Sequence, residues 1–503
     1  MSRGYAREAK AVGLMAREQS GGPRISDSAP DLHSIRWWAL RLEAFEVTTE
    51  TSQTRSARLG YFGFSRTAMR GAVALVAIVV LAACQTGQSG GGTKESITMW
   101  GTSNTLNDYW ATTLGDFEAK SGIKVNYLRV PEDGYNTKLQ TALTAKDSSF
   151  DVFIAYYGLL PAFKSMGAIA PLDSLISQSS AGADLADIAP RLVAACTYKG
   201  SVYCIPQFGD TTMLYYNKKI LGDAGINGPP KSWDELVADA AKVHNASHAG
   251  FCARSTVDSP SWFPGAMMLQ YFLPYSSQNM ASFLDDKWHP LLTTPEAFAM
   301  ASTYQKLLKQ YGPNGIASYG FQECEHDFQQ GKLAFFLDAS DFSGEILDPS
   351  KSTVVNQVGF ATIPCPASNS AHCTLTAPWG IFINQNGKHS AAGWKLIQWL
   401  SSKDIQTKSV KDGQFAPAVT RNSVLTALSG SKQLPTDLAN ALQQGYSTVD
   451  PLAFPQIPEV FDVLNPLSVA LSKILSGQAS STKAFTDANS QMTDILKKAG
   501  YIT

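Results

Sequence analysis

From residue 95 onward, short apolar runs alternate with longer segments whose apolar residues recur at helical spacing. In residues 106–121, Leu106, Trp110 and Leu114 fall on one face of a helix. The run FDVFIA at 150–155 is short, continuous and apolar, which predicts a buried strand. The expected elements are strand 96–100, helix 106–121, strand 123–130, helix 135–146 and strand 150–155. This order predicts right-handed crossovers and a largely parallel sheet, which together form one α/β lobe.

A second unit follows a short hairpin at 196–204. Ser232 and Glu235 stand three residues apart before an apolar run, which predicts a helix N-terminus closed by a capping box. The pattern then predicts strands 213–217, 332–338, 357–363 and 380–384, helical segments within 260–311, and mostly helix from Ser390 onward. We therefore expect a second α/β unit.

The N-terminal region carries an unbroken apolar run at 72–83, with Arg66 and Arg70 before it. This run fits the core of a signal peptide, because a membrane-spanning helix needs about 20 apolar residues. The run ends in Leu-Ala-Ala-Cys at 81–84, which resembles the bacterial lipobox and implies a lipid on Cys84 after removal of a leader, 1–83. A short buried helix that ends in an ordinary thiol is the alternative.

The segments on either side of the apolar run have different compositions. Residues 84–94 are rich in Gly and Ser after the cysteine, which predicts a flexible tether. The first 60 residues or so are too long for the start of a signal peptide. We expect the true start between Arg55 and Met69, and a genuine cytoplasmic extension is the alternative.

Length and charge narrow the class of protein. A chain of 503 residues is too long for one ordinary core, so two or more domains are expected. Only 17% of the residues are charged, the formal net charge is −1, and no long basic block follows the leader. This composition argues against a nucleic-acid-binding protein.

The cysteines that follow Cys84 favour disulfides. An oxidising compartment would pair the remaining six, and Cys196 and Cys204 flank a hairpin with its turn at Lys199-Gly200. The expected pairs are Cys196–Cys204, Cys365–Cys373 and Cys252–Cys324. Six reduced core thiols are the alternative. The chain has no Cys-x-x-Cys motif, so we expect neither a zinc site nor a redox site. No cofactor is expected.

Several local blocks, in their order along the chain, resemble the extracellular solute-binding proteins of carbohydrate importers. These blocks are 148–173, 199–217 and 229–236. Similarity to the sorbitol- and mannitol-binding branch of this family is found in three further blocks, 309–338, 340–349 and 377–384. The sequence departs from the family in its cysteine pairs and at 158–160, where a tryptophan is often found.

The resemblance implies an α/β, two-lobed periplasmic-binding-protein-like fold, with hinge strands and a ligand cleft between the lobes. We expect 95–209 and about 333–383 to form lobe 1, and 210–332 and about 384–503 to form lobe 2. Crossings are expected near 205–212 and 330–340, with a return near 380. The implied function is capture of a sugar or polyol for the permease subunits of an ABC importer. The protein would be an extracytoplasmic monomer of a bacterium, lipid-anchored to the cell membrane.

A sugar site needs aromatic faces for C–H groups, and fixed carboxylates, amides or guanidiniums for hydroxyls. Such residues should follow the carboxyl ends of strands. The candidates are Trp379, Tyr156, Tyr157, Asp210, Asp338, Asn104, Arg254, Trp262 and Arg421. For each, a packing, capping or solvated structural role is the alternative.

Two other functions are alternatives to the capture of a solute for an importer. An enzyme is one, but the sequence contains no Gly-x-Ser-x-Gly, His-Glu-x-x-His or dinucleotide-binding motif. Paired carboxylates of a glycoside hydrolase remain an open alternative. A receptor or adhesin on the same scaffold is the other.

Overall fold

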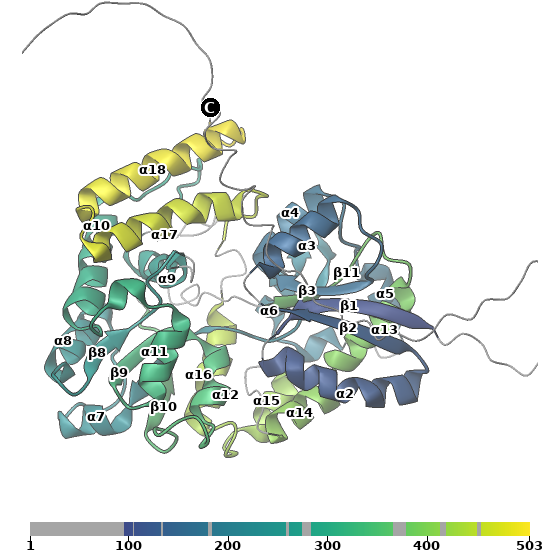
Figure 1. Cartoon of the computed structure of the whole chain (residues 1–503), viewed down its shortest axis with the longest axis horizontal. Helices are drawn as coiled ribbons and strands as arrows, with labels where there is room; N and C mark the ends of the chain where they lie inside the picture. Colours follow the sequence, from purple (N-terminus) through teal and green to yellow (C-terminus); the bar gives the residue numbers. More distant parts are fainter. Residues whose placement is uncertain are drawn as a thin grey trace, which may run out of the picture. The chain divides into compact units, whose positions relative to one another are not determined.

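The computed structural model describes residues 95–103, 105–131, 134–179, 184–257, 261–273, 283–365, 379–412, 419–449 and 454–502 (Figure 1). The predictions for the leader, for Cys84, for the tether and for Asn104 and Cys373 lie outside these residues. At Trp262 the backbone alone is described.

The first sheet has the strand order β2-β1-β3-β11-β6. Its strands are β1 (Ser96–Thr102), β2 (Lys124–Val130), β3 (Val152–Tyr156), β6 (Cys204–Pro206) and β11 (Trp379–Ile383). β1 is parallel to β2 and β3, whereas β11 is antiparallel to both β3 and β6. The sheet is therefore mixed, and the largely parallel arrangement expected from the sequence holds for the first three strands.

Helices from two parts of the chain accompany this sheet, and we call the assembly lobe 1. α2 (Thr105–Ser121) contacts β2, and α13 (Ser390–Leu400) contacts both β11 and α2. The other helices of this group are α3 (Tyr135–Thr144), α4 (Leu160–Ser165), α5 (Asp173–Gln178), α6 (Pro190–Ala195), α14 (Lys403–Lys411) and α15 (Asn422–Leu428).

The second sheet has the order β10-β7-β9-β8, and with its helices it forms lobe 2. The strands are β7 (Thr212–Asn217), β8 (Ala249–Cys252), β9 (Leu333–Ala339) and β10 (Val358–Ala361). The helices are α7 (Lys218–Asp223), α8 (Trp233–Val243), α9 (Trp262–Phe272), α10 (Pro295–Gln305), α11 (Phe321–Gln329), α12 (Ser343–Ile346), α16 (Thr436–Thr448), α17 (Val460–Ser476) and α18 (Ser481–Lys498). All seven residues of β9 are buried, as expected for a strand inside the sheet.

The start of α8 confirms the predicted N-terminus. The backbone N–H of Glu235 donates to Ser232 Oγ at 3.1 Å, and the Glu235 carboxylate accepts from the Lys231 N–H at 2.8 Å. The Glu235 carboxylate thus binds the N–H of Lys231, the residue before the N-cap, and not the N–H of Ser232 that a capping box requires.

The lobe boundaries differ from the expected ones in two places. We expected 333–383 in lobe 1, but β9 and β10 pair with β7 in lobe 2, so only β11 returns to the first sheet. We also expected everything after 384 in lobe 2, but α13 packs on β11 and is followed by α14 and α15. Strand pairing explains why β9 belongs to lobe 2, because β9 pairs with β7 along residues Thr212 to Tyr216. The crossing near 205–212 is present, and the one expected at 330–340 lies inside lobe 2.

Two disulfides are present among the described residues. Cys196 and Cys204 are joined across the hairpin of β4 (Thr197–Tyr198) and β5 (Ser201–Val202), with a Cα–Cα distance of 5.0 Å. The turn residues Lys199 and Gly200 have φ of 49° and 83°, as a tight two-residue hairpin turn requires. Cys252 at the end of β8 is joined to Cys324 in α11, with a Cα–Cα distance of 5.7 Å.

Candidate functional site

Asp210 lies where the chain passes from β6 to β7, and it connects this crossing to the end of β9. Its Oδ1 accepts from the Ser340 backbone N–H at 3.0 Å and from Ser340 Oγ at 3.1 Å. The Thr211 N–H donates to Ser340 Oγ at 3.1 Å, and all these groups are buried. Burial raises the pKa of the Asp210 carboxyl well above its usual value, and the carboxylates of Asp341 and Asp338 add to the rise. Asp210 therefore joins the crossing to the end of β9 through Ser340, in a buried site.

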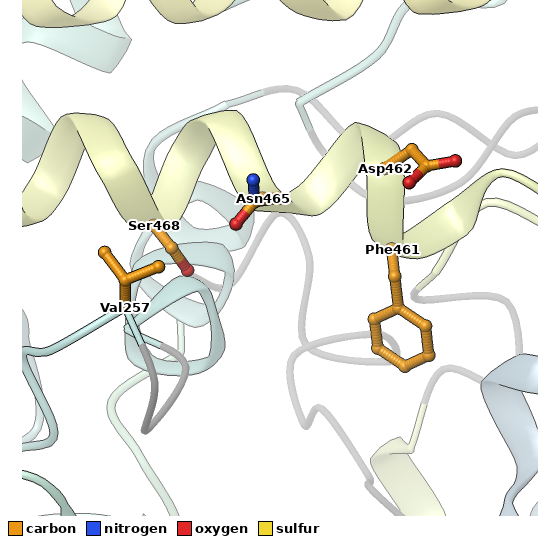
Figure 2. Close-up of a pocket in the computed structure, with 5 residues that line it drawn as sticks. All are labelled: Val257, Phe461, Asp462, Asn465 and Ser468. Atoms are coloured by element: carbon orange, nitrogen blue, oxygen red, sulfur yellow. The ribbon is translucent and has the colours of Figure 1, made fainter. Parts of the chain in front are cut away.

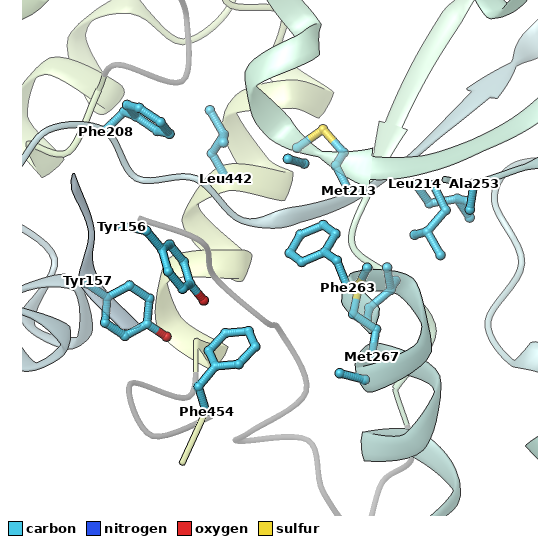
Figure 3. Packing of buried hydrophobic residues seen from close by; sticks show 14 of the residues in the cluster. Tyr156, Tyr157, Phe208, Met213, Leu214, Ala253, Phe263, Met267, Leu442 and Phe454 are labelled. Carbon is cyan, nitrogen blue, oxygen red and sulfur yellow. The ribbon is translucent and has the colours of Figure 1, made fainter. Parts of the chain in front are cut away.

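Tyr156 and Tyr157 stand at the carboxyl end of β3. The Tyr156 ring centroid lies 5.1 Å from that of Tyr157, 5.7 Å from Phe454 and 5.8 Å from Phe461. In Figure 3 Tyr156, Tyr157 and Phe454 form one group, with both tyrosine hydroxyls pointing to the same side. We call Tyr156, Tyr157, Phe454 and Phe461 the aromatic group.

The Tyr156 hydroxyl is buried and makes no hydrogen bond of normal length and angle among the described residues, although Tyr157 lies near enough to interact with it. Burial raises the pKa of this hydroxyl well above its usual value, and Tyr157 and Asp210 raise it further. An unmade bond of this kind costs roughly 1–3 kcal/mol. A bound hydroxyl group would supply the missing partner.

Arg254 and Asp338 form a buried ion pair in lobe 2. Arg254 Nε donates to Asp338 Oδ2 at 2.9 Å, and Arg254 Nη2 donates to Asp338 Oδ1. The guanidinium carbon lies 5.1 Å from the ring centroid of Phe263 and 5.2 Å from that of Phe321. Asp338 is fully buried, and the Arg254 side chain is 14% exposed. The two predicted residues are thus brought together, but as partners of each other.

Trp379 is half-buried at the start of β11, opposite Tyr156 in the antiparallel register. Its carbonyl oxygen accepts from the Gln207 N–H at 2.7 Å. The structure therefore places Trp379 next to the strand end that carries Tyr156, as predicted for a residue at a lobe crossing.

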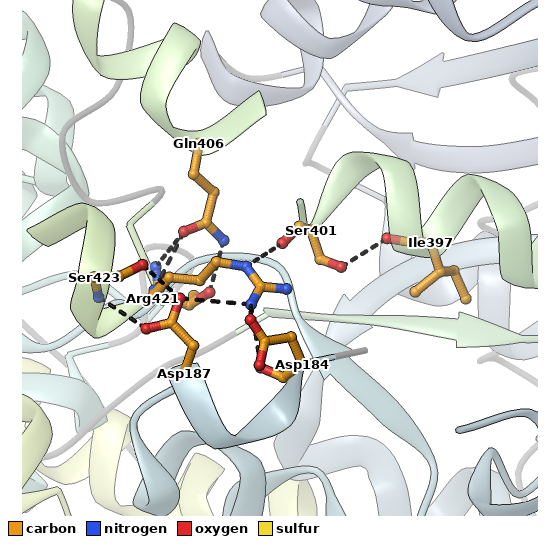
Figure 4. Close-up of polar contacts among 8 residues, drawn as sticks. Asp184, Asp187, Ile397, Ser401, Gln406, Arg421 and Ser423 are labelled. Atoms are coloured by element: carbon orange, nitrogen blue, oxygen red, sulfur yellow. Dashed lines mark hydrogen bonds and ion pairs between the residues drawn. The ribbon is translucent and has the colours of Figure 1, made fainter. Parts of the chain in front are cut away.

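Arg421 was predicted as a ligand contact, and its guanidinium instead has a structural role (Figure 4). Its Nε donates to the Ser401 carbonyl at 2.7 Å, and Nη1 donates to the Asp184 carbonyl at 3.1 Å. Nη1 also lies 3.7 Å from Asp187 Oδ2. Because the Arg421 side chain is 5% exposed, this guanidinium ties the 184–187 loop to the end of α13 and lies outside the candidate site.

A pocket of about 310 Å³ was not predicted. It is lined by Val257, Phe461, Asp462, Asn465 and Ser468 (Figure 2). Four of these residues fall on one face of α17, and this helical spacing is visible in the sequence. The sequence predicted mostly helix from Ser390 onward and only Arg421 as a ligand contact there, so Phe454 and Phe461 were also missed.

Two further observations concern the described residues. Within the described ranges, no group of three or more His, Cys, Asp or Glu side chains could hold a metal ion. A search of the same residues finds no helix with the length and apolar character needed to cross a membrane.

The comparison with known families decides the class. Residues 102–407 match the bacterial extracellular solute-binding protein family. The chain belongs to this family. Curated relatives of this solute-binding protein include the mannitol-binding protein of Pseudomonas aeruginosa, 23% identical over 76% of this chain and 89% of that protein. The erythritol/L-threitol-binding protein of Mycolicibacterium smegmatis is 22% identical over 74% of this chain and 80% of that protein.

Solved structures agree with this assignment. A solute-binding protein of Agrobacterium vitis with bound D-mannitol is 25% identical, with a TM-score of 0.67 over 81% of this chain and 99% of that one. A solute-binding protein of Agrobacterium radiobacter in complex with ribitol is 24% identical, with a TM-score of 0.71 over 80% of this chain and 98% of that one. The chain thus has the two-lobed α/β fold of these binding proteins.

Proposed function

We propose that this solute-binding protein captures a sugar or polyol and delivers it to an ABC importer. The observation that carries the proposal is the aromatic group at the end of β3, where the buried Tyr156 hydroxyl makes no hydrogen bond of normal length among the described residues and Asp210 is close enough to raise its pKa. Aromatic rings cover C–H groups, and hydroxyl and carboxylate oxygens bind hydroxyls. The relatives named for mannitol, erythritol and ribitol support a polyol as ligand.

The proposed ligand contacts are the strand-end residues of lobe 1 and the crossing. Tyr156 and Tyr157 supply rings and hydroxyls, Trp379 supplies an aromatic face, and Asp210 accepts from ligand hydroxyls. Asn104, Trp262, Arg254 and Asp338 are proposed as further contacts, with the ion pair forming part of the wall on the lobe 2 side. Arg421 is not included, because its guanidinium binds Ser401 and Asp184.

Binding is proposed to occur without turnover. Relatives named as binding proteins support this. We expect a dissociation constant of about 1 μM or tighter, which corresponds to about −8 kcal/mol. A receptor or adhesin on the same scaffold would bind the ligand, but deletion of its gene would leave uptake of the labelled ligand unchanged.

We further propose that the chain is an extracytoplasmic lipoprotein anchored through Cys84. Two or more acyl chains hold a protein firmly at a membrane, whereas one holds it only marginally. Metabolic labelling with a palmitate analogue tests this. Label is expected on the wild-type chain and should disappear in Cys84→Ala, and label that persists in that variant would contradict the anchor.

Calorimetric titration with sorbitol, mannitol, maltose and trehalose tests the ligand class. We expect saturable binding of at least one of them, and about tenfold weaker binding in Trp379→Ala. Trp399→Ala is the matched control, because Trp399 is also half-buried but lies in α13. No binding of any carbohydrate would contradict the proposal, and equal affinity in both variants would remove Trp379 from the site.

A further inference from the structure

The crossing from lobe 1 to lobe 2 lies directly against α16, because a glycine leaves no side chain between them. A Cβ at Gly209 would lie 2.5 Å from the Tyr446 hydroxyl oxygen and closer still to Cζ of the ring, so a side chain here would force the ring to move. The φ of Gly209 is not positive, so space and not backbone conformation requires glycine. Figure 3 shows the crossing, which carries Phe208, beside the helix that carries Leu442. The Tyr446 ring thus packs on the backbone next to Asp210.

A second glycine brings α16 equally close on the other side of Asp210. A Cβ at Gly445 would lie 2.9 Å from Thr211 Cγ2 and closer still to Thr211 Oγ1. Gly445 and Tyr446 are neighbours in α16, just as Gly209 and Thr211 are the two neighbours of Asp210. The helix therefore supports the backbone on both sides of a proposed ligand contact.

The Tyr446 side chain is itself held at its far end. Its hydroxyl donates to the Val419 carbonyl at 2.9 Å, and the whole residue is buried. Burial raises the pKa of this hydroxyl, and the Asp210 carboxylate raises it further, so the two groups lie close enough to interact. Packing and a hydrogen bond together lock a side-chain rotamer, which makes this ring a firm support for the crossing.

α16 is attached to both lobes. In lobe 2 it packs on β10, and Asp437 in its first turn binds Lys218 Nζ of α7 at 3.0 Å. In lobe 1 it contacts α6 and α15, and Arg191 Nη1 of α6 donates at 2.7 Å to the carbonyl of Val449, the residue that ends the helix. The crossing therefore packs on a helix that both lobes hold in place.

We propose that Tyr446 is a positioning residue for ligand capture, which holds the backbone at Gly209 so that the Asp210 carboxylate faces a bound hydroxyl. Ser340 fixes this carboxylate from the side of β9, and Tyr446 fixes its backbone from the side of α16. A polar group in a binding site must be held within about 0.5 Å of its productive position, which depends on the residues behind it. This inference rests on the proposed function, because it gives Tyr446 a part in binding the same sugar or polyol.

Calorimetry of the full chain tests the inference, with D-mannitol, sorbitol, maltose and trehalose for wild type and the tightest binder of the four for each variant. Tyr446→Leu should raise the Kd about tenfold, because one misplaced hydrogen bond is worth about that factor. Tyr446→Phe keeps the ring that supports Gly209 and should recover most of this loss. Tyr304→Leu is the matched control, because Tyr304 is also a buried helical tyrosine but lies in α10, which packs on α9, α17 and α18.

Gly209→Ala tests the contact from its other side. The added Cβ would meet the Tyr446 ring, so this variant should also bind about tenfold more weakly. The double variant Gly209→Ala with Tyr446→Leu should lose little more than either single variant, because both changes act on one contact. Losses that multiply to about a hundredfold would mean that the two residues act independently, and would overturn the inference.

The stoichiometry of binding separates positioning from stability. A residue that only stabilises the fold would lower the fraction of chains that bind and leave the Kd of that fraction unchanged, as we expect for Tyr304→Leu. An unchanged Kd in Tyr446→Leu or in Gly209→Ala, or an equal rise in Tyr304→Leu, would overturn the inference and leave sugar binding standing. Absence of binding by the wild-type chain with all four carbohydrates would contradict the proposed function itself.

Discussion

The Arg254–Asp338 pair allows a quantitative test of how lobe 2 is held together. Asp338 is fully buried and receives two hydrogen bonds from a guanidinium that lies within about 5 Å of the centroids of two phenylalanine rings. In Arg254→Met, Asp338 would lose its cation and both of those bonds. Removing one partner of a buried ion pair costs about 3–5 kcal/mol, because the remaining charge stays desolvated. We therefore expect Arg254→Met to lower the free energy of unfolding by that amount.

Urea unfolding with the disulfides oxidised, followed by circular dichroism, measures the effect. The control is Arg129→Met, because Arg129 binds Asp108 at 2.7 Å with both side chains 40% or more exposed, and such pairs contribute about 0–1 kcal/mol. The double variant Arg254→Met with Asp338→Leu should recover most of the loss, since an apolar pair leaves no buried charge. A loss below about 1 kcal/mol in Arg254→Met would refute this reasoning.

Three other changes have predicted outcomes. Tyr156→Phe should leave the unliganded protein at least as stable in urea unfolding, because its buried hydroxyl makes no hydrogen bond of normal length among the described residues, and should weaken polyol binding in calorimetry. Stability that falls together with affinity would contradict this. Replacing Cys252 and Cys324 together by Ser should cost about 2–4 kcal/mol, because that disulfide closes a loop with a sequence separation of 72, and an unchanged denaturation midpoint would exclude the effect. Burial and three neighbouring carboxylates raise the pKa of Glu325 to about 9 from 4.5. The folded protein then keeps a proton that the unfolded chain releases, so the stability of wild type relative to Glu325→Gln should fall as the pH rises from about 4.5 to 9, by on the order of 1 kcal/mol per pH unit. A difference that does not change with pH would contradict this assignment.

Local signals in the sequence predicted most elements of the fold. The N-cap bond at Ser232 and the Lys199-Gly200 turn both formed, because each depends only on neighbouring residues, whereas the return bond of the predicted capping box goes to Lys231 instead of Ser232. The assignment of β9 and β10 to a lobe was wrong, because strand pairing between 212–216 and 335–339 is non-local and leaves no periodic signal in either segment. The position of α13 on lobe 1 likewise depends on β11 returning between β3 and β6.

The candidate site could be predicted only where a local signal, such as the end of a strand, marks a residue. Tyr156 could be selected because it stands at the end of a predicted strand, and Asp210 and Trp379 because they lie at expected crossings. Arg421 was selected by residue type alone, and its guanidinium is buried against Ser401 and the 184–187 loop. The α17 residues were missed because a helix face with Asp, Asn and Ser is typical of a solvated surface, and only the packing of the opposite face on α9 shows where it lies.

The central claim is that this solute-binding protein holds a polyol or sugar and releases it unchanged. Calorimetric titration of the full chain with D-mannitol and ribitol, followed by chromatography of the recovered ligand, tests it most directly. The account predicts saturable binding at one site for at least one of them, with a dissociation constant of about 1 μM or tighter and all ligand recovered unaltered. No heat of binding with either polyol or with any sugar, or a new product in the recovered ligand, would contradict it.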